Sequence, residues 1–258
     1  MKVEEEIDLT LECDDVDAPP SKRQRSLCGE EPPHELRCPI SQTMFRDPVM
    51  VFASGHTYER QAVRDLFWAA EEGHERVAKL LLENGAAVDV KDNIERTALH
   101  IAAAHGNEPV AKLFLENGAA VDAKDKDDWT ALHCAAENGH EPVAKLLLEN
   151  GAAVDAKAAT DSTALHLAAI NGHESVAKLL LENGAAVDVK DIIERTALHI
   201  AAAHGHEPVA KLFLENGAAV DVKDKDDWTA LHWAAAYGHE PVAKLLLENG
   251  SCISGATS

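Results

Sequence analysis

The tetrapeptide Thr-Ala-Leu-His recurs through this chain at a fixed distance, and no other feature restricts the fold as strongly. Successive copies lie 33 residues apart and begin at Thr97, Thr130, Thr163, Thr196 and Thr229. Such a period is typical of a stack of supersecondary units, each of which packs on its neighbours because it cannot bury an apolar face alone. The spacing therefore predicts an elongated solenoid.

Each period predicts a finger-like loop followed by two helices. In residues 119–151 a polar, turn-rich stretch comes first, and Thr130 then stands where a helix N-cap belongs. Gly139 and Gly151 end the two helices, because glycine readily adopts the left-handed conformation that closes many helices. Pro142 lies in the first turn of the second helix, where its missing N–H does no harm. The predicted fold class is mostly α.

These residues resemble the ankyrin repeat. The matching pattern is T-A-L-H-x-A-A, a glycine nine residues after the threonine, and a helix reading V-A-K-L-x-L-E-N-G-A. The resemblance covers residues 64–250 and implies an ankyrin-repeat solenoid of six units, the first beginning near Arg64. It also implies a protein partner, bound on the concave face by the fingers and the first helices.

The chain departs from the ankyrin pattern at the tips of its fingers. The position two residues before each threonine usually holds glycine in that family, and here it holds a charged residue. These residues are Glu95, Asp128, Asp161, Glu194 and Asp227. Aspartate tolerates a positive φ better than glutamate does, so the tips at Glu95 and Glu194 are expected to be strained or reshaped.

A block of three units has been duplicated. Residues 77–151 match residues 176–250 at 69 of 75 positions. The differences are Asn93/Ile192, Asn107/His206, Ala123/Val222, Cys134/Trp233, Glu137/Ala236 and Asn138/Tyr237. Three of these pairs fall where ankyrin proteins usually contact partners, which is more than chance would place there and favours a binding role. Free drift of surface residues is the competing explanation.

The charge balance restricts the class of partner. Asp and Glu outnumber Lys and Arg by 45 to 24, which gives a formal charge of −21. So acidic a surface repels phosphate groups, so neither nucleic acid nor an anionic membrane is expected as a partner. The acidic start differs from a secretory signal and no apolar run reaches the length of a membrane span, so the cytoplasm is the expected location. The basic run at residues 21–25 would add the nucleus if it were an import signal, but a solvated charge cluster is the commoner meaning of so short a run.

The cysteines and histidines predict no metal site and no cofactor. The five cysteines form no Cys-x-x-Cys pair and are odd in number, so neither zinc nor a disulfide framework is expected, and a reducing compartment fits best. The recurring His-Glu pair begins the zinc-protease motif H-E-x-x-H, but alanine always stands at the second histidine position. That class of protease is therefore excluded, and no catalytic residue is predicted in the repeats.

A second module precedes the repeats. Its elements are Cys38-Pro39-Ile40, Met44, Asp47-Pro48-Val49, Gly55-His56-Thr57-Tyr58-Glu59-Arg60 and Ala62-Val63. In this order and spacing they resemble the U-box, the zinc-free relative of the RING domain found in E3 ubiquitin ligases. A lone Cys38 cannot hold zinc, which agrees with a U-box and argues against a RING. The resemblance implies a hairpin within residues 47–58, a helix after it, and an E2 ubiquitin-conjugating enzyme as a partner.

The U-box resemblance stops at Phe67, near the middle of such a domain. This family binds an E2 through a first loop, a central helix and a second loop. By that pattern Ile40 is the first-loop contact, Leu66 falls where the central helix usually presents a tryptophan, and the second loop has no counterpart. The two modules overlap from Val63 to Trp68, so a single helix is expected to serve both.

These interpretations divide the chain into four parts. They are a disordered acidic tail (1–32), a partial U-box (33–67), the ankyrin repeats (64–250) and a C-terminal tail (251–258). The ankyrin pattern also assigns candidate partner contacts. They are Ile94, Arg96, Trp129, Glu137, Asn138, Ile170, Ile193, Arg195, Trp228 and Tyr237.

Two hypotheses for function follow. In the first, the chain is a U-box E3 ligase in which the partial U-box recruits an E2 and the repeats hold a substrate. Such a ligase works by positioning and forms no covalent intermediate of its own. In the second, the chain is a non-catalytic ankyrin adaptor that carries a U-box remnant. The U-box resemblance favours the first, and the missing second half of that domain favours the second.

Overall fold

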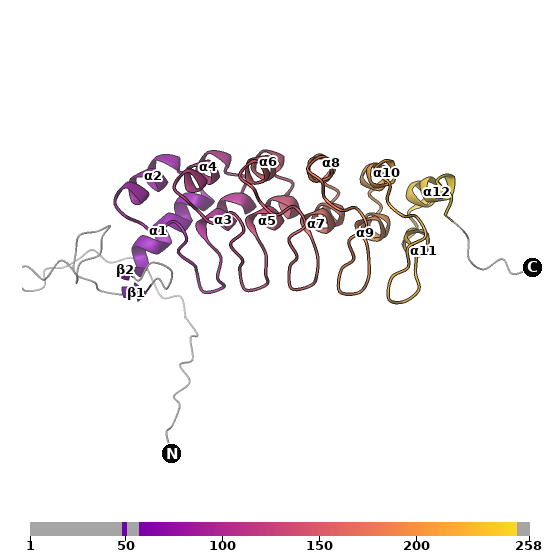
Figure 1. The fold of residues 1–258 in the computed structure, drawn as a ribbon, viewed down its shortest axis with the longest axis horizontal. Helices are drawn as coiled ribbons and strands as arrows, with labels where there is room; N and C mark the ends of the chain where they lie inside the picture. Colours follow the sequence, from indigo (N-terminus) through magenta and orange to yellow (C-terminus); the bar gives the residue numbers. More distant parts are fainter. Residues whose placement is uncertain (1–47, 51–56, 252–258) are drawn as a thin grey trace, which may run out of the picture.

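The computed structural model describes residues 48–50 and 57–251. The predicted tail at 1–32, the basic run at 21–25, Ile40 and residues 252–258 lie outside the described residues. The described chain forms two short strands and an elongated stack of helix pairs, so the predicted mostly-α solenoid is confirmed. Figure 1 shows the helices in two rows, with hairpin-like fingers extending from the stack beside the inner row.

The two rows alternate along the sequence, and each unit contributes one helix to each row. The inner helices are α1 (Arg60–Glu71), α3 (Ala98–Ala104), α5 (Ala131–Asn138), α7 (Ala164–Asn171), α9 (Ala197–His204) and α11 (Ala230–Ala236). The outer helices are α2 (Glu75–Glu83), α4 (Glu108–Glu116), α6 (Glu141–Glu149), α8 (Glu174–Glu182), α10 (Glu207–Glu215) and α12 (Glu240–Glu248). Each helix packs on its partner in the unit and on the same helix of the adjacent units.

One apolar core runs the length of the stack between the two rows. The paired alanines of each inner helix, such as Ala102 and Ala103, are fully buried, and their small side chains let neighbouring helices approach closely. The largest fully buried side chains are Phe114 on α4 and Phe213 on α10. The other outer helices carry leucine at that position, which explains how a chain so poor in aromatic residues fills its core.

The histidine of T-A-L-H joins one unit to the next in units two to five. In unit three the N–H of Thr130 donates to Nδ1 of His133 at 3.1 Å, and Nε2 of that ring lies 3.2 Å from the carbonyl oxygen of Ser162 in the following finger. Because Nδ1 accepts a hydrogen bond, the ring proton is on Nε2, which donates to the next unit. The same arrangement recurs at His100, His166 and His199. These side chains are structural, and all four are almost fully buried.

All five finger tips adopt the left-handed conformation that glycine usually fills. Glu95, Asp128, Asp161, Glu194 and Asp227 have φ values of 64°, 60°, 57°, 63° and 61°. A side chain in this region is strained by the proximity of Cβ to the following carbonyl oxygen, and aspartate relieves part of that strain by local hydrogen bonding. The expected strain at the two glutamate tips is therefore present.

We expect Glu95→Gly to stabilise the fold more than Asp128→Gly does, by about 0.5 kcal/mol. Both substitutions remove an exposed ion pair with a lysine and add the same flexibility to the unfolded chain, so these effects cancel in the comparison. The difference in urea midpoint between the two variants measures the excess strain at glutamate. Equal midpoints, or a reversed order, would show that the two side chains tolerate the conformation equally.

The hairpin expected within residues 47–58 is confirmed, with its end one residue later. Strand β1 (Pro48–Met50) pairs antiparallel with β2 (Thr57–Glu59), and Val49 lies opposite Tyr58. Helix α1 begins at the next residue and runs to Glu71 without a break. A single helix therefore serves both modules, as the overlap of the two patterns predicted.

Candidate protein-binding surface

The fingers and the adjacent side of the inner helices form one continuous surface, which we call the finger face (Figure 1). Its five fingers comprise residues 86–96, 119–129, 152–162, 185–195 and 218–228. Every candidate partner contact predicted from the sequence lies on a finger or an inner helix, except Tyr237, which is the C-cap residue of α11.

An aspartate braces four of the fingers from inside. In unit two Oδ1 of Asp92 accepts the N–H groups of Ile94 and Arg96 at 3.0 and 2.9 Å, which closes the loop around the strained tip. Asp125, Asp191 and Asp224 make the equivalent pair of bonds. Unit four has Ala158 at this position, so its tip lacks this brace. Local bonds of this kind stabilise tight turns without help from the core.

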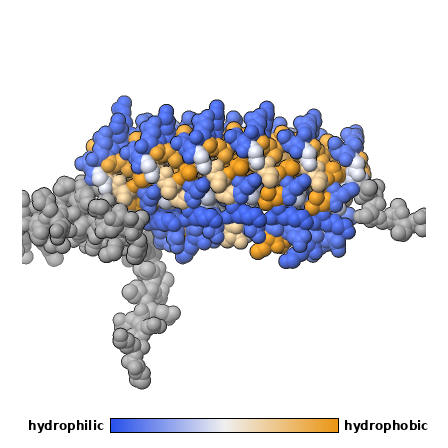
Figure 2. Space-filling view, viewed as in Figure 1, coloured by the Kyte–Doolittle hydropathy of each residue, from blue (hydrophilic) through white to orange (hydrophobic). Residues whose placement is uncertain are grey.

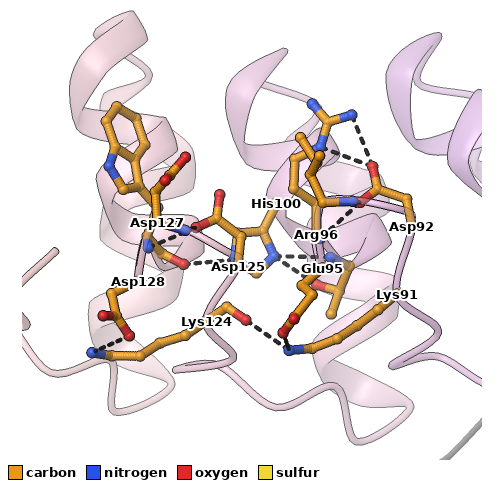
Figure 3. Close-up of polar contacts among 12 residues, drawn as sticks. Lys91, Asp92, Glu95, Arg96, His100, Lys124, Asp125, Asp127 and Asp128 are labelled. Atoms are coloured by element: carbon orange, nitrogen blue, oxygen red, sulfur yellow. Dashed lines mark hydrogen bonds and ion pairs between the residues drawn. The ribbon is translucent and has the colours of Figure 1, made fainter. Parts of the chain in front are cut away.

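A lysine ladder links three of the four pairs of neighbouring fingers. Nζ of Lys91 lies 3.3 Å from the carboxylate of Glu95 at its own tip and 2.8 Å from the carbonyl oxygen of Lys124 in the next finger. In the same way Lys124 pairs with Asp128 at its own tip and donates to the carbonyl oxygen of Lys157 in the following finger. Figure 3 shows the two contacts of Lys91 and the ion pair between Lys124 and Asp128. Each exposed ion pair contributes little free energy. Together with the backbone contact, however, each fixes the spacing of two neighbouring fingers.

Backbone hydrogen bonds also connect the finger tips to one another. The N–H of Lys126 donates to the carbonyl of Ile94 at 3.1 Å, and the N–H of Lys225 donates to the carbonyl of Ile193 at 3.1 Å. Two further bonds of this kind join Ala159 to Asp127 and Ile192 to Thr160. A surface braced in this way is ordered before any partner arrives, so little conformational entropy is lost on binding.

The structure divides the predicted contacts into exposed and restrained side chains. Ile94, Ile193, Trp228, Tyr237, Glu137 and Asn138 are exposed, while Ile170 and Trp129 are half-buried. Arg96 and Arg195 are held by ion pairs of 2.8 and 2.9 Å to Asp92 and Asp191. In Figure 2 a hydrophilic band follows the fingers, and a hydrophobic patch interrupts it toward the C-terminal half. The exposed apolar side chains of the fourth finger, at residues 185–195, are Ile192 and Ile193.

The two equivalent finger tryptophans lie in different surroundings. Trp129 packs against the core and its ring centroid lies 6.0 Å from that of His133. Trp228 lies 6.3 Å from His232 in the same way, but 38% of it is exposed and it also meets Trp233 edge-on at 5.1 Å. Trp129 therefore supports its own unit, whereas Trp228 belongs to a larger exposed cluster.

Unit six carries a row of aromatic rings that its duplicate, unit three, lacks. Trp233 stacks on Tyr237 with centroids 5.9 Å apart, and Tyr237 in turn lies 6.4 Å from His239. Tyr237 is 61% exposed. Unit three has Cys134 and Asn138 at the two positions that build this row. The row of Trp228, Trp233 and Tyr237, which we call the aromatic row, is the main concentration of exposed aromatic surface on the described fingers and inner helices.

The aromatic row is anchored to the finger by Asp224. Nε1 of Trp233 donates to Oδ2 of this carboxylate at 2.8 Å. Burial alone would raise the pKa of Asp224, but hydrogen bonds from the Trp228 and Asp226 N–H groups and from Trp233 lower it below the usual range. The carboxylate therefore stays charged and holds the indole in place.

Two exposed or partly exposed tryptophans were absent from the predicted contacts. Trp233 lies at the variable position of T-A-L-H-x-A-A, where Ile101 and Leu167 are buried, so the repeat pattern alone gives no sign that it is partly exposed. The sequence signal that could have identified Trp233 is the difference between the duplicated blocks, which have Cys134 and Trp233 at equivalent positions. Trp68 occupies the same position in α1 and is exposed, and no ankyrin finger precedes unit one in the part of the chain that the structure describes.

The predicted E2 contacts have different outcomes. Ile40 lies outside the described residues. Leu66 is 1% exposed and lies within the ankyrin core, so its assignment as a surface contact for an E2 is wrong. The physical reason is the register of α1, in which Leu66 takes the place of the buried leucine of T-A-L-H. The shared helix thus uses this residue for ankyrin packing.

The described residues contain no group of three or more side chains suited to a metal ion. Cys134 is buried, and burial raises the pKa of its thiol to about 12, which leaves it protonated and unreactive at neutral pH. None of the helices in the described part of the chain combines the length and the apolar composition that a membrane crossing requires.

Comparison with known families identifies both modules. The family model for ankyrin repeats matches residues 66–158, 126–191 and 165–255. The family model for the U-box domain matches residues 32–71. The ankyrin matches therefore cover most of the chain, and the U-box match ends at the last residue of α1.

Two curated proteins of Arabidopsis thaliana are similar to about a quarter of this chain. U-box domain-containing protein 16 is 40% identical over 62 residues, which is 24% of this chain and 9% of that protein. U-box domain-containing protein 45 is 42% identical over 59 residues, which is 23% of this chain and 7% of that protein. The chain thus spans less than a tenth of either relative.

Proposed function

The chain belongs to the ankyrin-repeat family, and on that premise we propose that it is a protein-interaction scaffold whose finger face binds a protein partner. The observation that carries this proposal is the braced row of fingers, on which Ile193 and Trp228 stay exposed, with the exposed Tyr237 beside them at the end of α11. Large aromatic side chains on a preordered surface are typical anchors of protein interfaces.

The duplicated halves support units five and six as the principal contact region. At three exposed positions the second half replaces a polar or charged residue with an apolar or aromatic one. The pairs, first half then second, are Asn93 and Ile192, Glu137 and Ala236, and Asn138 and Tyr237. Drift on a solvated surface has no reason to run in one direction, whereas adaptation to an apolar contact does. The formal charge of −21 further favours a partner with basic groups around its apolar centre.

We expect Tyr237→Asn, which restores the residue of unit three, to weaken partner binding by about 1–3 kcal/mol without lowering the melting temperature. Trp228→Ala should act similarly on affinity. Trp129→Ala is the matched control, because its half-buried ring is expected to affect stability more than affinity. Peptides selected on the wild-type chain from a random display library provide the ligand, and calorimetry with thermal melts separates the two effects. Unchanged affinity for Tyr237→Asn would contradict a role for the aromatic row.

We propose further that the N-terminal module is a candidate E3 ubiquitin-ligase element that recruits an E2. The U-box match at residues 32–71 and the two U-box relatives support this role. In this proposal Ile40 is the E2 contact and a substrate is held on the finger face. The proposed ligase acts by positioning, since no nucleophile of its own is required.

We expect a panel of E2 enzymes, tested by autoubiquitination and by NMR shift mapping, to include at least one whose interaction Ile40→Ala abolishes. Leu66→Ala is not a usable probe, because it would open a cavity in the ankyrin core. The fold of each variant is checked by circular dichroism. If no E2 perturbs the wild-type spectrum, the ligase proposal loses its mechanism.

The alternative proposal is a non-catalytic adaptor that retains part of a U-box. One specific observation favours it: Leu66, on the helix that a U-box uses for its E2, is committed to the ankyrin core. In this case the finger face binds its partner as before, and no E2 interaction or ubiquitin transfer is detected.

A further inference from the structure

Unit one presents an apolar surface at the N-terminal end of the stack. Val77 on α2 is 45% exposed, whereas the valines at the same position in the five later units are at most 1% exposed. Those valines are Val110, Val143, Val176, Val209 and Val242. Each of them has a preceding helix pair beside it, and Val77 has none among the described residues, so a preceding unit is what covers this position. Leu80, on the next turn of α2, is exposed for the same reason.

Unit six presents the complementary surface at the C-terminal end. Ala235 is exposed, whereas the alanines at its position in units two to five are fully buried. Those alanines are Ala103, Ala136, Ala169 and Ala202. Leu247 on α12 is also exposed, although its equivalents in the other units are half-buried. A following unit is what covers these positions inside the stack.

A side-chain latch joins consecutive units inside the stack. Nε2 of His173 in unit four lies 3.0 Å from the carbonyl oxygen of Glu137 in unit three. The ring lies so close over Gly139 that a Cβ atom there would be 2.6 Å from it. The same latch joins His140 to Ala104, His206 to Ile170 and His239 to Ala203. At the first junction Asn107 makes the equivalent contact, donating to the carbonyls of Ala70 and Glu71 and lying over Gly73. The latch therefore needs a histidine or an asparagine on one unit, and a glycine with a backbone carbonyl near it on the unit before.

The two ends of the stack each hold half of this latch. Gly238 in unit six has open space where its five equivalents meet the side chain of the next unit. His74 in unit one is exposed and occupies the position of the latching histidines. The carbonyl group that corresponds to that of Glu137 is the carbonyl of Ala236.

One junction inside the stack already packs a surface like that of unit six on a surface like that of unit one. Because of the duplication, the C-terminal surface of unit six corresponds to that of unit three, and the outer-helix surface of unit one corresponds to that of unit four. His74, Val77 and Leu80 correspond to His173, Val176 and Leu179, and Leu231, Ala235 and Leu247 correspond to Leu132, Ala136 and Leu148. Every residue in these pairs is identical in type. The junction of units three and four thus already packs one such surface on the other.

We propose that copies of this chain associate head to tail, with unit six of one copy covering unit one of the next. In this junction Val77 and Leu80 pack on the α11–α12 end of the preceding copy. Nε2 of His74 donates to the carbonyl of the preceding copy's Ala236, and its ring lies over the preceding copy's Gly238. The interaction goes beyond the proposed partner binding, because it uses the ends of the stack and leaves the finger face free.

The geometry of this junction determines the kind of assembly. The two surfaces are different, so the contact is heterologous and each copy keeps one free end, which gives open chains and no closed dimer. Unit one has no ankyrin finger before it to accept a bond from His232, so the junction lacks one element of the internal template. Two copies with a formal charge of −21 also repel each other. Association is therefore reversible, rises with protein concentration and strengthens with ionic strength.

Sedimentation velocity on the full chain, over a range of protein concentrations and at low and high ionic strength, tests the proposal. The average mass of the sedimenting species should rise with protein concentration and with ionic strength. Val77→Glu and Ala235→Glu should each weaken self-association by at least about tenfold, because either one places an unpaired charge in the junction. His74→Ala, a mild surface change, should weaken it roughly fivefold, as expected for one hydrogen bond. Lys145→Glu, an exposed substitution on the middle of the outer row, is the matched control and should have no effect.

Mixing the two charge variants distinguishes head-to-tail contact from any symmetric one. Val77→Glu keeps an intact C-terminal end, and Ala235→Glu keeps an intact N-terminal end. Each should be monomeric alone, and an equimolar mixture should form a dimer and nothing larger. Circular dichroism melts confirm that each variant is folded.

Three outcomes overturn the proposal. A wild-type chain that stays monomeric at every concentration, with Val77→Glu lowering its melting temperature, means that residues upstream of α1 in the same chain cover this surface. Self-association abolished by Val77→Glu but untouched by Ala235→Glu means a symmetric contact between two N-terminal ends. Self-association that survives both substitutions places the contact elsewhere.

Discussion

Acidification below about pH 6.5 should destabilise the ankyrin stack cooperatively. Burial lowers the pKa of His100, His133, His166 and His199 below that of a free histidine. The unfolded chain therefore binds these protons at a higher pH than the folded chain does. Their contribution to stability is complete above the unfolded pKa and is lost as the pH falls toward the folded pKa values.

The hydrogen bonds of these histidines also predict that protonation destabilises the fold, independently of the effect of burial on the pKa. Nδ1 of each ring accepts the N–H of the capping threonine, so a proton placed on Nδ1 would face another donor. The four groups act together, so the free energy of unfolding should change with a slope that approaches about 1.4 kcal/mol per pH unit for each histidine involved.

Urea unfolding at a series of pH values between neutrality and about pH 5 measures this slope. Replacement of His133 by glutamine, which removes one of the four titrating groups, should reduce the slope by about one proton even if it also lowers stability overall. A slope that is the same in the variant and in the wild-type chain would mean that the acid sensitivity has another origin.

Phe114→Ala should cause the largest loss of stability of any single substitution considered, about 3–5 kcal/mol. The ring is fully buried between the two helix rows, and its removal leaves a cavity that flanking units cannot fill without moving. The chain supplies its own matched control. Units three, four and six carry Leu147, Leu180 and Leu246 at this position, so Phe114→Leu should lose less than about 1.5 kcal/mol.

Denaturant unfolding of both variants, with Phe213→Ala as a duplicate in unit five, provides the measurement. Phe114 and Phe213 occupy identical positions in the duplicated block, so similar losses are expected from the two alanine variants. A loss for Phe114→Leu that equals the loss for Phe114→Ala would show that the shape of the ring, and not the volume that it fills, determines packing at this position.

The parts of the fold that local sequence determines could be predicted. The repeat period, the threonine caps and the closing glycines such as Gly139 depend on residues close together in the chain, and all take the expected places. The hairpin and the shared helix α1 also follow from local patterns. The strained finger tips were expected because a single position, occupied by Glu95 in unit two, has a known backbone requirement.

The parts that depend on neighbouring units could not be read in the same way. Leu66 matches a U-box contact position and an ankyrin core position at once, and only packing decides between them. Trp233 stands at a position that is buried in units two to five, and it is partly exposed in unit six, which has no following unit among the described residues to cover it. Similarly, Val77 has nearly the same local sequence as the buried valines, and its exposure reflects the absence of a preceding helix pair among the described residues.

Helix α1 has a mechanical consequence for anything bound at both modules. Because this helix belongs to the hairpin module at one end and to the ankyrin stack at the other, no flexible tether separates them. Two proteins bound to the hairpin module and to the ankyrin stack would be held at one fixed separation. A flexible tether between the modules would instead allow many separations. A helix of this length spans about 18 Å, so the distance between the two binding sites depends on the length of α1 and its rise per residue. Inserting residues into α1 would rotate one site about the other by about 100° per residue, and activity that needs both sites should follow that rotation.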